Sequence, residues 1–141
     1  MSTEANVEVM LEIFRAIERR DLQGFLGLCR PDVEFHWPPS LPYGGTSPST
    51  GWAETWVPLQ PTPAEQHMDP RVVAARDDEV VVLWHQRGAI RSGERFDAPV
   101  LALYHVRDGK LARAQMFYFD TVPLVSFLAH ARSTAAGDTT A

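Results

Sequence analysis

The fold of this chain is decided by residues 79–106, which read EVVVLWHQRGAIRSGERFDAPVLALYHV. Two runs rich in Val, Leu and aromatic residues flank the pair Ser92-Gly93, a pattern typical of two antiparallel strands joined by a tight turn. The first run is almost wholly apolar until it reaches His85 and Arg87. Whether these two polar side chains face the core or the solvent therefore bears directly on function.

Further strands extend this hairpin on both sides. A strand is predicted over residues 65–75, and the turn residues 76–78 join it to the start of the hairpin. Another is predicted over residues 110–120, after the turn Asp108-Gly109. Upstream, residues 32–37 (DVEFHW) alternate apolar and polar side chains with the period of a half-buried strand. The sequence therefore predicts a four-stranded meander preceded by one separate strand.

Helices are predicted before the strands. Apolar residues recur at helical spacing over residues 5–19, and Asp21 is a suitable N-cap for a second helix over residues 22–29. A third, short helix is predicted over residues 52–57. Helices followed by a meander indicate an α+β domain, with the helices on one face of a curved antiparallel sheet.

Two segments give weaker signals. Residues 38–51 are rich in Pro, Gly and Ser, which predicts a loop without regular structure, and a loop of this length is more often functional than idle. Residues 123–131 are compatible either with a last strand edge or with a helical turn. We expect a single domain over residues 1–130 and a flexible C-terminal tail over residues 131–141, whose side chains are small and polar.

Composition narrows the functional classes. The chain has 141 residues and a net charge of −5, with acids and bases interspersed, so it lacks the basic stripe that a nucleic-acid partner requires. No apolar run is long enough for a membrane span, and Cys29 alone can form neither an intramolecular disulfide nor a thiolate zinc site. Acidic residues near the start are unlike a signal peptide, so we expect a cytoplasmic protein.

The order of elements, together with the motifs DVEFHWPP, EVVVLW, VRDGK and YFD and the residue Gly51, resembles the nuclear transport factor two-like superfamily, and within it the SnoaL-like branch. The resemblance spans roughly residues 5–130. Relatives include ketosteroid isomerases, limonene epoxide hydrolases, polyketide cyclases and dehydratases. It implies a cone-shaped sheet around the helices, a small-molecule cavity at the open end, and a homodimer formed across the sheet.

The family's catalytic acids are replaced here. Carried over by position, they correspond to Trp37, to Ala102, and to Met116 or Phe117, all of which are apolar. A carboxylate base of the isomerase kind and the paired carboxylates of the hydrolase kind both need an acid at these positions. A catalytic protein of this sequence would have to use other residues.

Hairpin pairing supplies candidates. If Ser92 and Gly93 are the two loop residues, His85 pairs with Val100, and Arg87 lies on the same face. That face also carries Ala102, the family's pocket position, although a bulge would reverse the assignment. The competing interpretation places Arg87 at a solvated rim and His85 in a hydrogen-bonded wall.

The predicted site follows from this register. His85 is the candidate base, and Arg87, Tyr43 and Gln115 are the candidates for orienting or stabilising a substrate oxygen. A bulge at the last turn would replace Gln115 by Met116 and Tyr118 in the cavity. Asp120 is interpreted as a structural acceptor near the cavity floor. The predicted substrate-binding residues are Phe14, Trp37, Trp56, Leu83, Val100, Ala102, Met116, Phe117, Tyr118 and Asp120.

We therefore predict a cofactor-independent cyclase, isomerase or dehydratase of polyketide-like secondary metabolism, with a hydrophobic pocket. The alternatives are a non-catalytic small-molecule binding or assembly module and an epoxide hydrolase. No metal site is expected, because the histidines have no partners at ligand spacing. An outward apolar face is expected to form the homodimer, and its predicted members are Val82, Trp84, Leu101 and Leu103.

Overall fold

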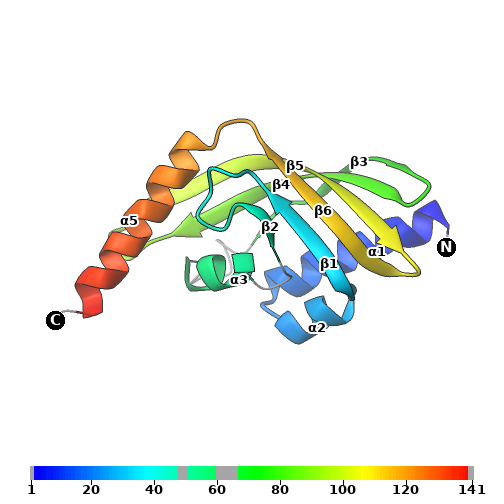
Figure 1. The fold of residues 1–141 in the computed structure, drawn as a ribbon, viewed down its shortest axis with the longest axis horizontal. Helices are drawn as coiled ribbons and strands as arrows, with labels where there is room; N and C mark the ends of the chain where they lie inside the picture. Colours follow the sequence, from blue (N-terminus) through cyan, green and yellow to red (C-terminus); the bar gives the residue numbers. More distant parts are fainter. Residues whose placement is uncertain (1, 48–50, 60–66, 140–141) are drawn as a thin grey trace.

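The computed structural model describes residues 2–47, 51–59 and 67–139. Two helices come first, a third lies between the second and third strands of a six-stranded curved sheet, and a final helix ends the chain (Figure 1). The helices are α1 (Thr3–Glu18), α2 (Leu22–Gly27), α3 (Gly51–Trp56), the 3-10 turn η1 (Val57–Leu59) and α5 (Val122–Thr139). The strands are β1 (Cys29–Trp37), β2 (Gly45–Ser47), β3 (Arg71–Arg76), β4 (Glu79–Ala89), β5 (Arg95–Arg107) and β6 (Lys110–Tyr118).

Capping side chains mark where the two N-terminal helices begin. The Ser2 side chain accepts a hydrogen bond from the backbone N–H of Ala5, which caps α1. Asp21 caps α2 in the same way, by accepting from the N–H of Gly24 at 2.9 Å, so its predicted role is confirmed. The helix ends at Gly27, and β1 begins at Cys29, earlier than the alternation in the sequence indicates.

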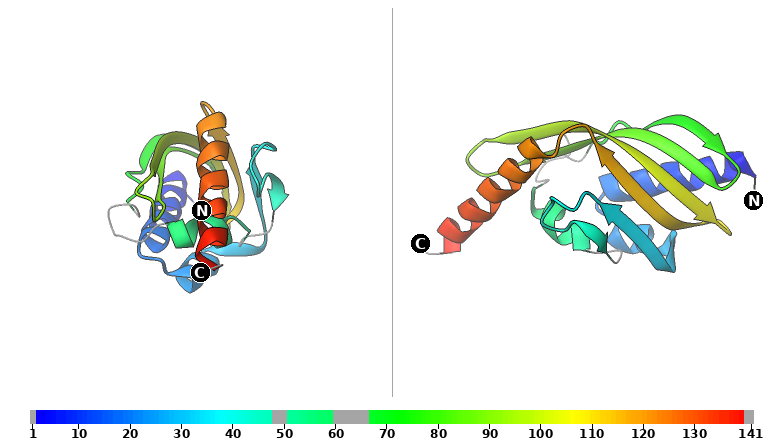
Figure 2. Two further views of the ribbon diagram at one scale, coloured as in Figure 1. Left: turned by 90° about the vertical axis from the view of Figure 1, so that its left-hand side faces the viewer. Right: turned by 45° about the horizontal axis from the view of Figure 1, so that its top comes forward.

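The strands are ordered β2-β1-β6-β5-β4-β3, and the sheet does not close. All neighbouring pairs are antiparallel except β1 and β6, which run parallel. The chain between them, from β2 to β5, is long enough for the crossover that a parallel pair needs. The sheet arches around α1 when the molecule is viewed along its long axis (Figure 2). This is the expected α+β cone, and the fold prediction is confirmed.

The core lies between the concave face of the sheet and the helices. On β4 the buried side chains include Val80, Val82 and Trp84, and on β5 they include Val100 and Ala102. These residues alternate with partly or fully exposed neighbours, as expected for a sheet that has one covered face. Val82 and Trp84 therefore belong to the core, and the prediction that they lie on an outward dimer face is wrong.

The β4–β5 register differs from the predicted one by one residue. Arg87 is opposite Asp97 and His85 is opposite Pro99, because the loop comprises residues 90–94 and not Ser92-Gly93 alone. A shift of one residue moves every side chain to the other face. The predicted register would have buried His85 and Arg87, whose desolvation is costly, whereas the observed one buries Trp84 and its apolar neighbours.

The β5–β6 register follows the bulged alternative. Ala102 is opposite Met116 and Leu103 is opposite Gln115, with an irregularity between His105 and Val106. Asp108 and Gly109 both have positive φ, at 53° and 75°, as the turn requires. Met116 and Tyr118 therefore lie on the concave face. Gln115 and Phe117 lie on the convex face, so the prediction that they face the cavity is wrong.

Three segments depart from the sequence interpretation. The strand β2 lies inside residues 38–51, for which a loop without regular structure was predicted. Residues 123–131 are helical, and α5 continues through residues expected to be a flexible tail. The first meander strand begins at Arg71, and part of its predicted range, residues 65–66, lies outside the described residues. Within the described segments, no helix is both long and apolar enough to cross a membrane.

Candidate functional site

A cavity of about 210 Å³ lies between the concave face of the sheet and helices α1, α2 and α3. Its wall is overwhelmingly apolar, and aromatic side chains from both the helices and the strands contribute to it. These aromatic residues are Phe14, Phe25, Phe35, Trp37, Trp52, Trp56, Trp84 and Tyr104. Such a wall favours a flat hydrophobic ligand.

Edge-to-face contacts hold these rings in place. The ring centroids of Trp37 and Tyr43 are 5.1 Å apart with nearly perpendicular planes, and Phe25 meets Trp52 in the same way at 5.5 Å. On the other side of the cavity, the Phe14 ring lies 6.0 Å from Trp84. These are favourable aromatic geometries, and they give the wall a fixed shape.

A buried hydrogen-bond network adjoins the cavity. The indole N–H of Trp56 donates to the hydroxyl of Tyr43 at 2.6 Å, and the hydroxyl of Tyr118 donates to Oε1 of Gln86. Tyr43 also interacts with Gln86 and Tyr118. Burial raises the pKa of Tyr43 to about 12 and raises the pKa of Tyr118 well above its ordinary value. Both phenols are therefore neutral at physiological pH, when they can donate hydrogen bonds but cannot serve as bases.

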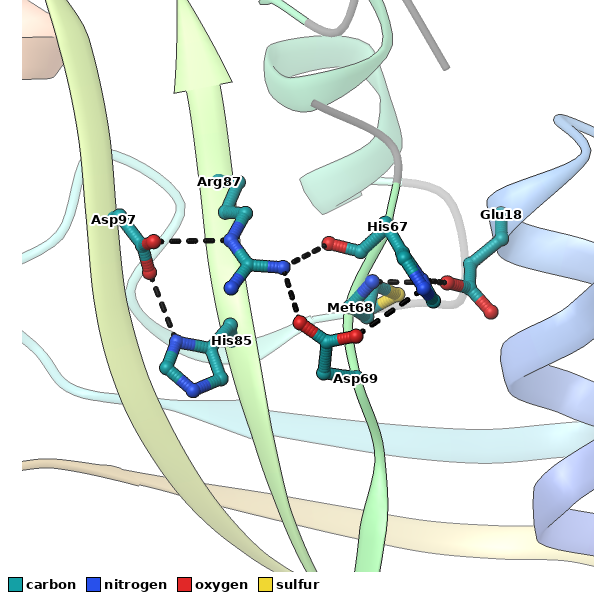
Figure 3. Close-up of polar contacts among 7 residues, drawn as sticks. All are labelled: Glu18, His67, Met68, Asp69, His85, Arg87 and Asp97. Atoms are coloured by element: carbon teal, nitrogen blue, oxygen red, sulfur yellow. Dashed lines mark hydrogen bonds and ion pairs between the residues drawn. The ribbon is translucent and has the colours of Figure 1, made fainter. Parts of the chain in front are cut away.

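His85 and Arg87 belong to a polar cluster on the opposite face of β4 (Figure 3). His85 Nδ1 is 2.9 Å from a carboxylate oxygen of Asp97, and Arg87 Nε donates to the other oxygen at 3.0 Å. Burial acts to raise the pKa of Asp97, but the hydrogen bonds from His85 and Arg87 outweigh it and leave the pKa below its usual value. The guanidinium also donates to Asp69 at 2.7 Å.

The same cluster fastens residues 67–69, which we call the clamp, to α1 and β4 (Figure 3). Glu18 accepts from the backbone N–H of Met68 at 2.9 Å and contacts the imidazole of His67 at 2.5 Å. Arg87 donates to the carbonyl of His67 at 2.8 Å, and the N–H of His85 donates to the carbonyl of Met68 at 2.7 Å. Because Met68 lines the cavity, the cluster fixes one edge of its wall.

The structure divides the predicted site residues into two groups. Phe14, Trp37, Trp56 and Met116 lie on the cavity wall. Val100 and Ala102 are fully buried on the concave face, and Tyr118 belongs to the buried network. These positions are compatible with ligand binding, and their roles toward a ligand stay predictions. Tyr43 packs edge-to-face on Trp37 and accepts a hydrogen bond from Trp56.

The other predicted residues lie elsewhere. Leu83 is opposite Leu101 on the convex face, together with Gln115 and Phe117. Asp120 is exposed, and it accepts from the N–H of Val122 at 3.0 Å, where it caps α5 rather than supporting the cavity floor. A helix start that follows the last strand directly needs such a cap.

His85 contributes to both the cavity and the polar cluster. It contributes to the cavity lining, and its main chain adjoins Met68 there, but its imidazole is paired with Asp97 on the convex side. Arg87 is likewise engaged by two carboxylates and a carbonyl. Arg87 is not among the residues that line the cavity, so its predicted placement there is wrong, and the reason is the longer β4–β5 loop. The role of His85 toward a ligand stays a prediction.

Sequence reasoning missed Gln86 and Trp84 as wall residues. Gln86 and Trp84 were missed because the assumed turn assigned the even-numbered positions of β4 to the outside. The cost of burying Arg87 was the signal that would have reversed that assignment. Among the described wall residues the only carboxylate is that of Asp21, which is occupied as the α2 cap. No cluster of metal-ligating side chains occurs in the described part of the chain.

Comparison with known proteins agrees with this architecture. A SnoaL-like domain model matches residues 10–114. A structure of TerC co-crystallised with polyporic acid is 22% identical, with a TM-score of 0.71, and the match covers 89% of this chain and 98% of TerC. No sequence among the curated proteins matches.

Two further solved structures share the fold. AclR, a putative hydroxylase from Streptomyces galilaeus, is 18% identical with a TM-score of 0.67, and the match covers 92% of this chain and 98% of AclR. A putative polyketide cyclase from Xanthomonas campestris pv. campestris is 16% identical with a TM-score of 0.66, covering 89% and 98% of the two chains. Since the family model spans well over half of the sequence, this chain belongs to the SnoaL-like domain family.

Proposed function

We propose that this protein binds a small, flat, hydrophobic molecule of the polyketide type and promotes its cyclisation, isomerisation or dehydration without a cofactor. The observation that carries the proposal is the aromatic cavity, which is apolar around most of its wall and adjoins a neutral hydrogen-bond network. Two structural neighbours, a putative polyketide cyclase and a protein crystallised with polyporic acid, support the same substrate class.

The size of the cavity limits the ligand. Its volume of about 210 Å³ lies below the ~300–1,000 Å³ that is typical of pockets for drug-sized molecules. A one-ring or two-ring molecule, or a folded chain of similar bulk, fits this volume. We therefore propose a short polyketide-like substrate rather than a large polycyclic one.

The chemistry that suits this wall is polarisation of a carbonyl. Neutral donors in an apolar site stabilise the negative charge that develops on oxygen when a carbonyl is attacked or enolised. In a substrate with three or more carbonyls at alternate carbons, the enol carbon at one end would attack a non-adjacent carbonyl of the same molecule to close a six-membered ring. One carbon–carbon bond forms, and the enol proton passes to the new alkoxide, so no cofactor is required. A carboxylate base is not part of this proposal.

A second candidate function is binding without transformation. It is favoured by the scarcity of bases on the described wall, where Asp21 is the sole carboxylate and is engaged with the N–H of Gly24. Epoxide hydrolysis is not supported, because it would require a pair of carboxylates to activate water and protonate the epoxide oxygen. The enzyme and the binding module differ in one observable: only the enzyme converts its ligand.

Binding and turnover can be measured on the same samples. Tryptophan fluorescence would report binding of 2-naphthol, and mass spectrometry would follow the conversion of a synthetic aryl-capped β-triketone. Saturable binding with accelerated cyclisation supports the enzyme, and saturable binding at the uncatalysed rate selects the binding module. If neither compound binds, the proposed function is overturned. An Ala53→Phe variant, which fills the wall, should lose binding, whereas Gln115→Phe on the convex face should keep it.

We also propose a cytoplasmic homodimer. Support for the dimer comes from the convex face, where Leu101 is opposite Phe117 and their exposed fractions are 42% and 50%. Support for a reducing compartment comes from Cys29, a buried free thiol whose pKa burial raises to about 12. Such a thiol is unreactive, so it has no role in the proposed chemistry.

A further inference from the structure

Gln86 is an unusual residue for its position. It lies on the concave face of β4 between Trp84 and Gly88, it lines the cavity, and 5% of its surface is exposed. Asn6 is the only other polar residue in the core among the described parts of the chain, and it is not on the cavity wall. A carboxamide retained in an aromatic wall needs hydrogen-bond partners to offset its desolvation.

Two phenols supply partners for this carboxamide. Tyr118 donates to Oε1 of Gln86, and Tyr43 interacts with the same side chain. A glutamine side chain has two N–H donors and two acceptor lone pairs on its oxygen. Two partners occupy half of these four positions, so the carboxamide retains capacity for a further hydrogen bond.

The phenols also fix the carboxamide in place. Trp56 donates to Tyr43, and Tyr43 packs edge-to-face on Trp37, so the network is bound to two walls of the cavity. Burial keeps both phenols neutral, so the orientation does not change across physiological pH. A polar group that neighbouring side chains hold in position is prepared to bind a ligand at little entropic cost.

We infer that Gln86 is the ligand-orienting residue of the cavity, where its carboxamide donates a hydrogen bond to a carbonyl oxygen at one end of an otherwise apolar ligand. The inference rests on the proposed function and deepens it, because it specifies an oxygen acceptor and the end of the cavity that receives it. A hydrocarbon of the same shape would offer no acceptor to the carboxamide of Gln86.

The test compares 1-tetralone with tetralin, two bicyclic molecules of the same shape that differ by one carbonyl oxygen. Dissociation constants would be measured by quenching of tryptophan fluorescence, since four tryptophans line the wall. We expect the wild-type protein to bind tetralone roughly three- to tenfold more tightly, the ratio that one neutral hydrogen bond supplies. Equal affinities would overturn the inference and leave the proposed function intact, whereas no binding of either probe would overturn both.

Substitutions test whether Gln86 causes the preference for tetralone over tetralin. Gln86→Met keeps the length of the side chain and removes the donor, so the affinity ratio should fall to about one. Gln115→Met is the matched control, because Gln115 lies on the convex face, and it should retain the wild-type ratio. A ratio that persists in Gln86→Met contradicts the inference.

A second variant covers the case in which Gln86→Met does not fold. Tyr118→Phe removes the hydroxyl that holds Oε1 of Gln86 and leaves the ring in place. The affinity ratio should decrease in this variant, because the carboxamide is less well oriented. A purely structural role of the network would weaken both probes equally, and an unchanged ratio in Tyr118→Phe would argue against orientation by Gln86.

Discussion

At the scale of single residues, Gly88 shows how closely the core is packed. A Cβ at this position would lie 2.8 Å from a ring carbon of Trp56 and 3.4 Å from Phe127. Neither ring can move freely, because Trp56 is hydrogen-bonded to Tyr43 and stacked on Phe127. Because Gly88 has no side chain, Trp56 of α3 and Phe127 of α5 can both pack against this position of β4.

The substitution Gly88→Ala should lower the free energy of unfolding by about 1–3 kcal/mol, the usual cost of overpacking a core. Urea denaturation followed by tryptophan fluorescence would measure it. Gly27→Ala is the control, since a Cβ there meets no atom within 4 Å, and it should be neutral or slightly stabilising. A loss of less than 0.5 kcal/mol in Gly88→Ala, on the order of a surface substitution, would contradict this account of the packing.

At the scale of elements, the clamp of residues 67–69 joins α1 to the edge of the sheet. His67 lies between two carboxylates, with Nδ1 at 2.5 Å from Glu18 and Nε2 at 3.2 Å from Asp69. The hydrogen bond to Glu18 is the main cause that raises the pKa of His67, followed by the charges of Glu18 and Asp69, while Arg87 acts in the opposite direction. The protonated imidazole therefore favours the folded state.

This arrangement predicts a pH dependence of stability. A raised pKa in the folded protein means that the stabilisation is complete below the ordinary imidazole pKa of ~6.5 and is lost as the pH rises through the folded-state value. Glu18→Gln keeps an acceptor for the N–H of Met68 but removes the charge that faces His67. Wild-type protein should exceed this variant in melting temperature most clearly below pH 6.5, with the gap narrowing above it.

The expected difference is small, because 64% of the His67 side chain is exposed and water screens such pairs. Differential scanning fluorimetry at several pH values would resolve it. His130→Gln is a suitable control, since His130 forms a separate exposed pair with Glu94 on α5 and the β4–β5 loop. A gap that stays constant with pH in Glu18→Gln would show that the charge on His67 does not contribute.

At the scale of the whole molecule, the two faces of the sheet carry different sets of side chains. The concave face holds the core and the cavity, while the convex face carries Leu83, Leu101, Leu103 and Phe117. Phe119, which follows β6, is 98% exposed. In their strands, Leu83, Leu101, Leu103 and Phe117 alternate with the buried residues of the concave face. A second copy of the chain would cover them.

The proposed homodimer should dissociate when a charge is placed on the convex face. Phe117→Asp is expected to raise the dimer dissociation constant about 30-fold or more, as for a buried aromatic interface residue. Sedimentation velocity across a range of concentrations would measure the change. Leu22→Asp changes a similarly exposed leucine on α2, away from the sheet, and should leave the association unchanged. A monomeric wild-type protein would refute the dimer outright.

Local patterns were sufficient for the type and order of most elements. Helical spacing and the Asp21 cap predict α1 and α2, alternation predicts β1, and β-rich runs between turn residues predict the meander. The short strand β2 could not be predicted, because three residues in a Pro/Gly-rich segment carry no periodic signal and pair only when β1 is present. The helical character of α5 was likewise open, since its hydrophobic residues contact Trp56 and Phe96, distant partners in the sequence.

The sequence by itself therefore determined the fold class, because periodicity and turn residues are local properties, and its motifs and order of elements carried the resemblance to the family. Only the tertiary structure decided which residues form the cavity. The β4–β5 loop is three residues longer than a two-residue turn, since it comprises residues 90–94, and that difference reverses the faces of β4. Desolvation explains the outcome: the chain buries Trp84 and Gln86, which the aromatic wall and two phenols can accommodate, and leaves His85 and Arg87 paired with Asp97 outside.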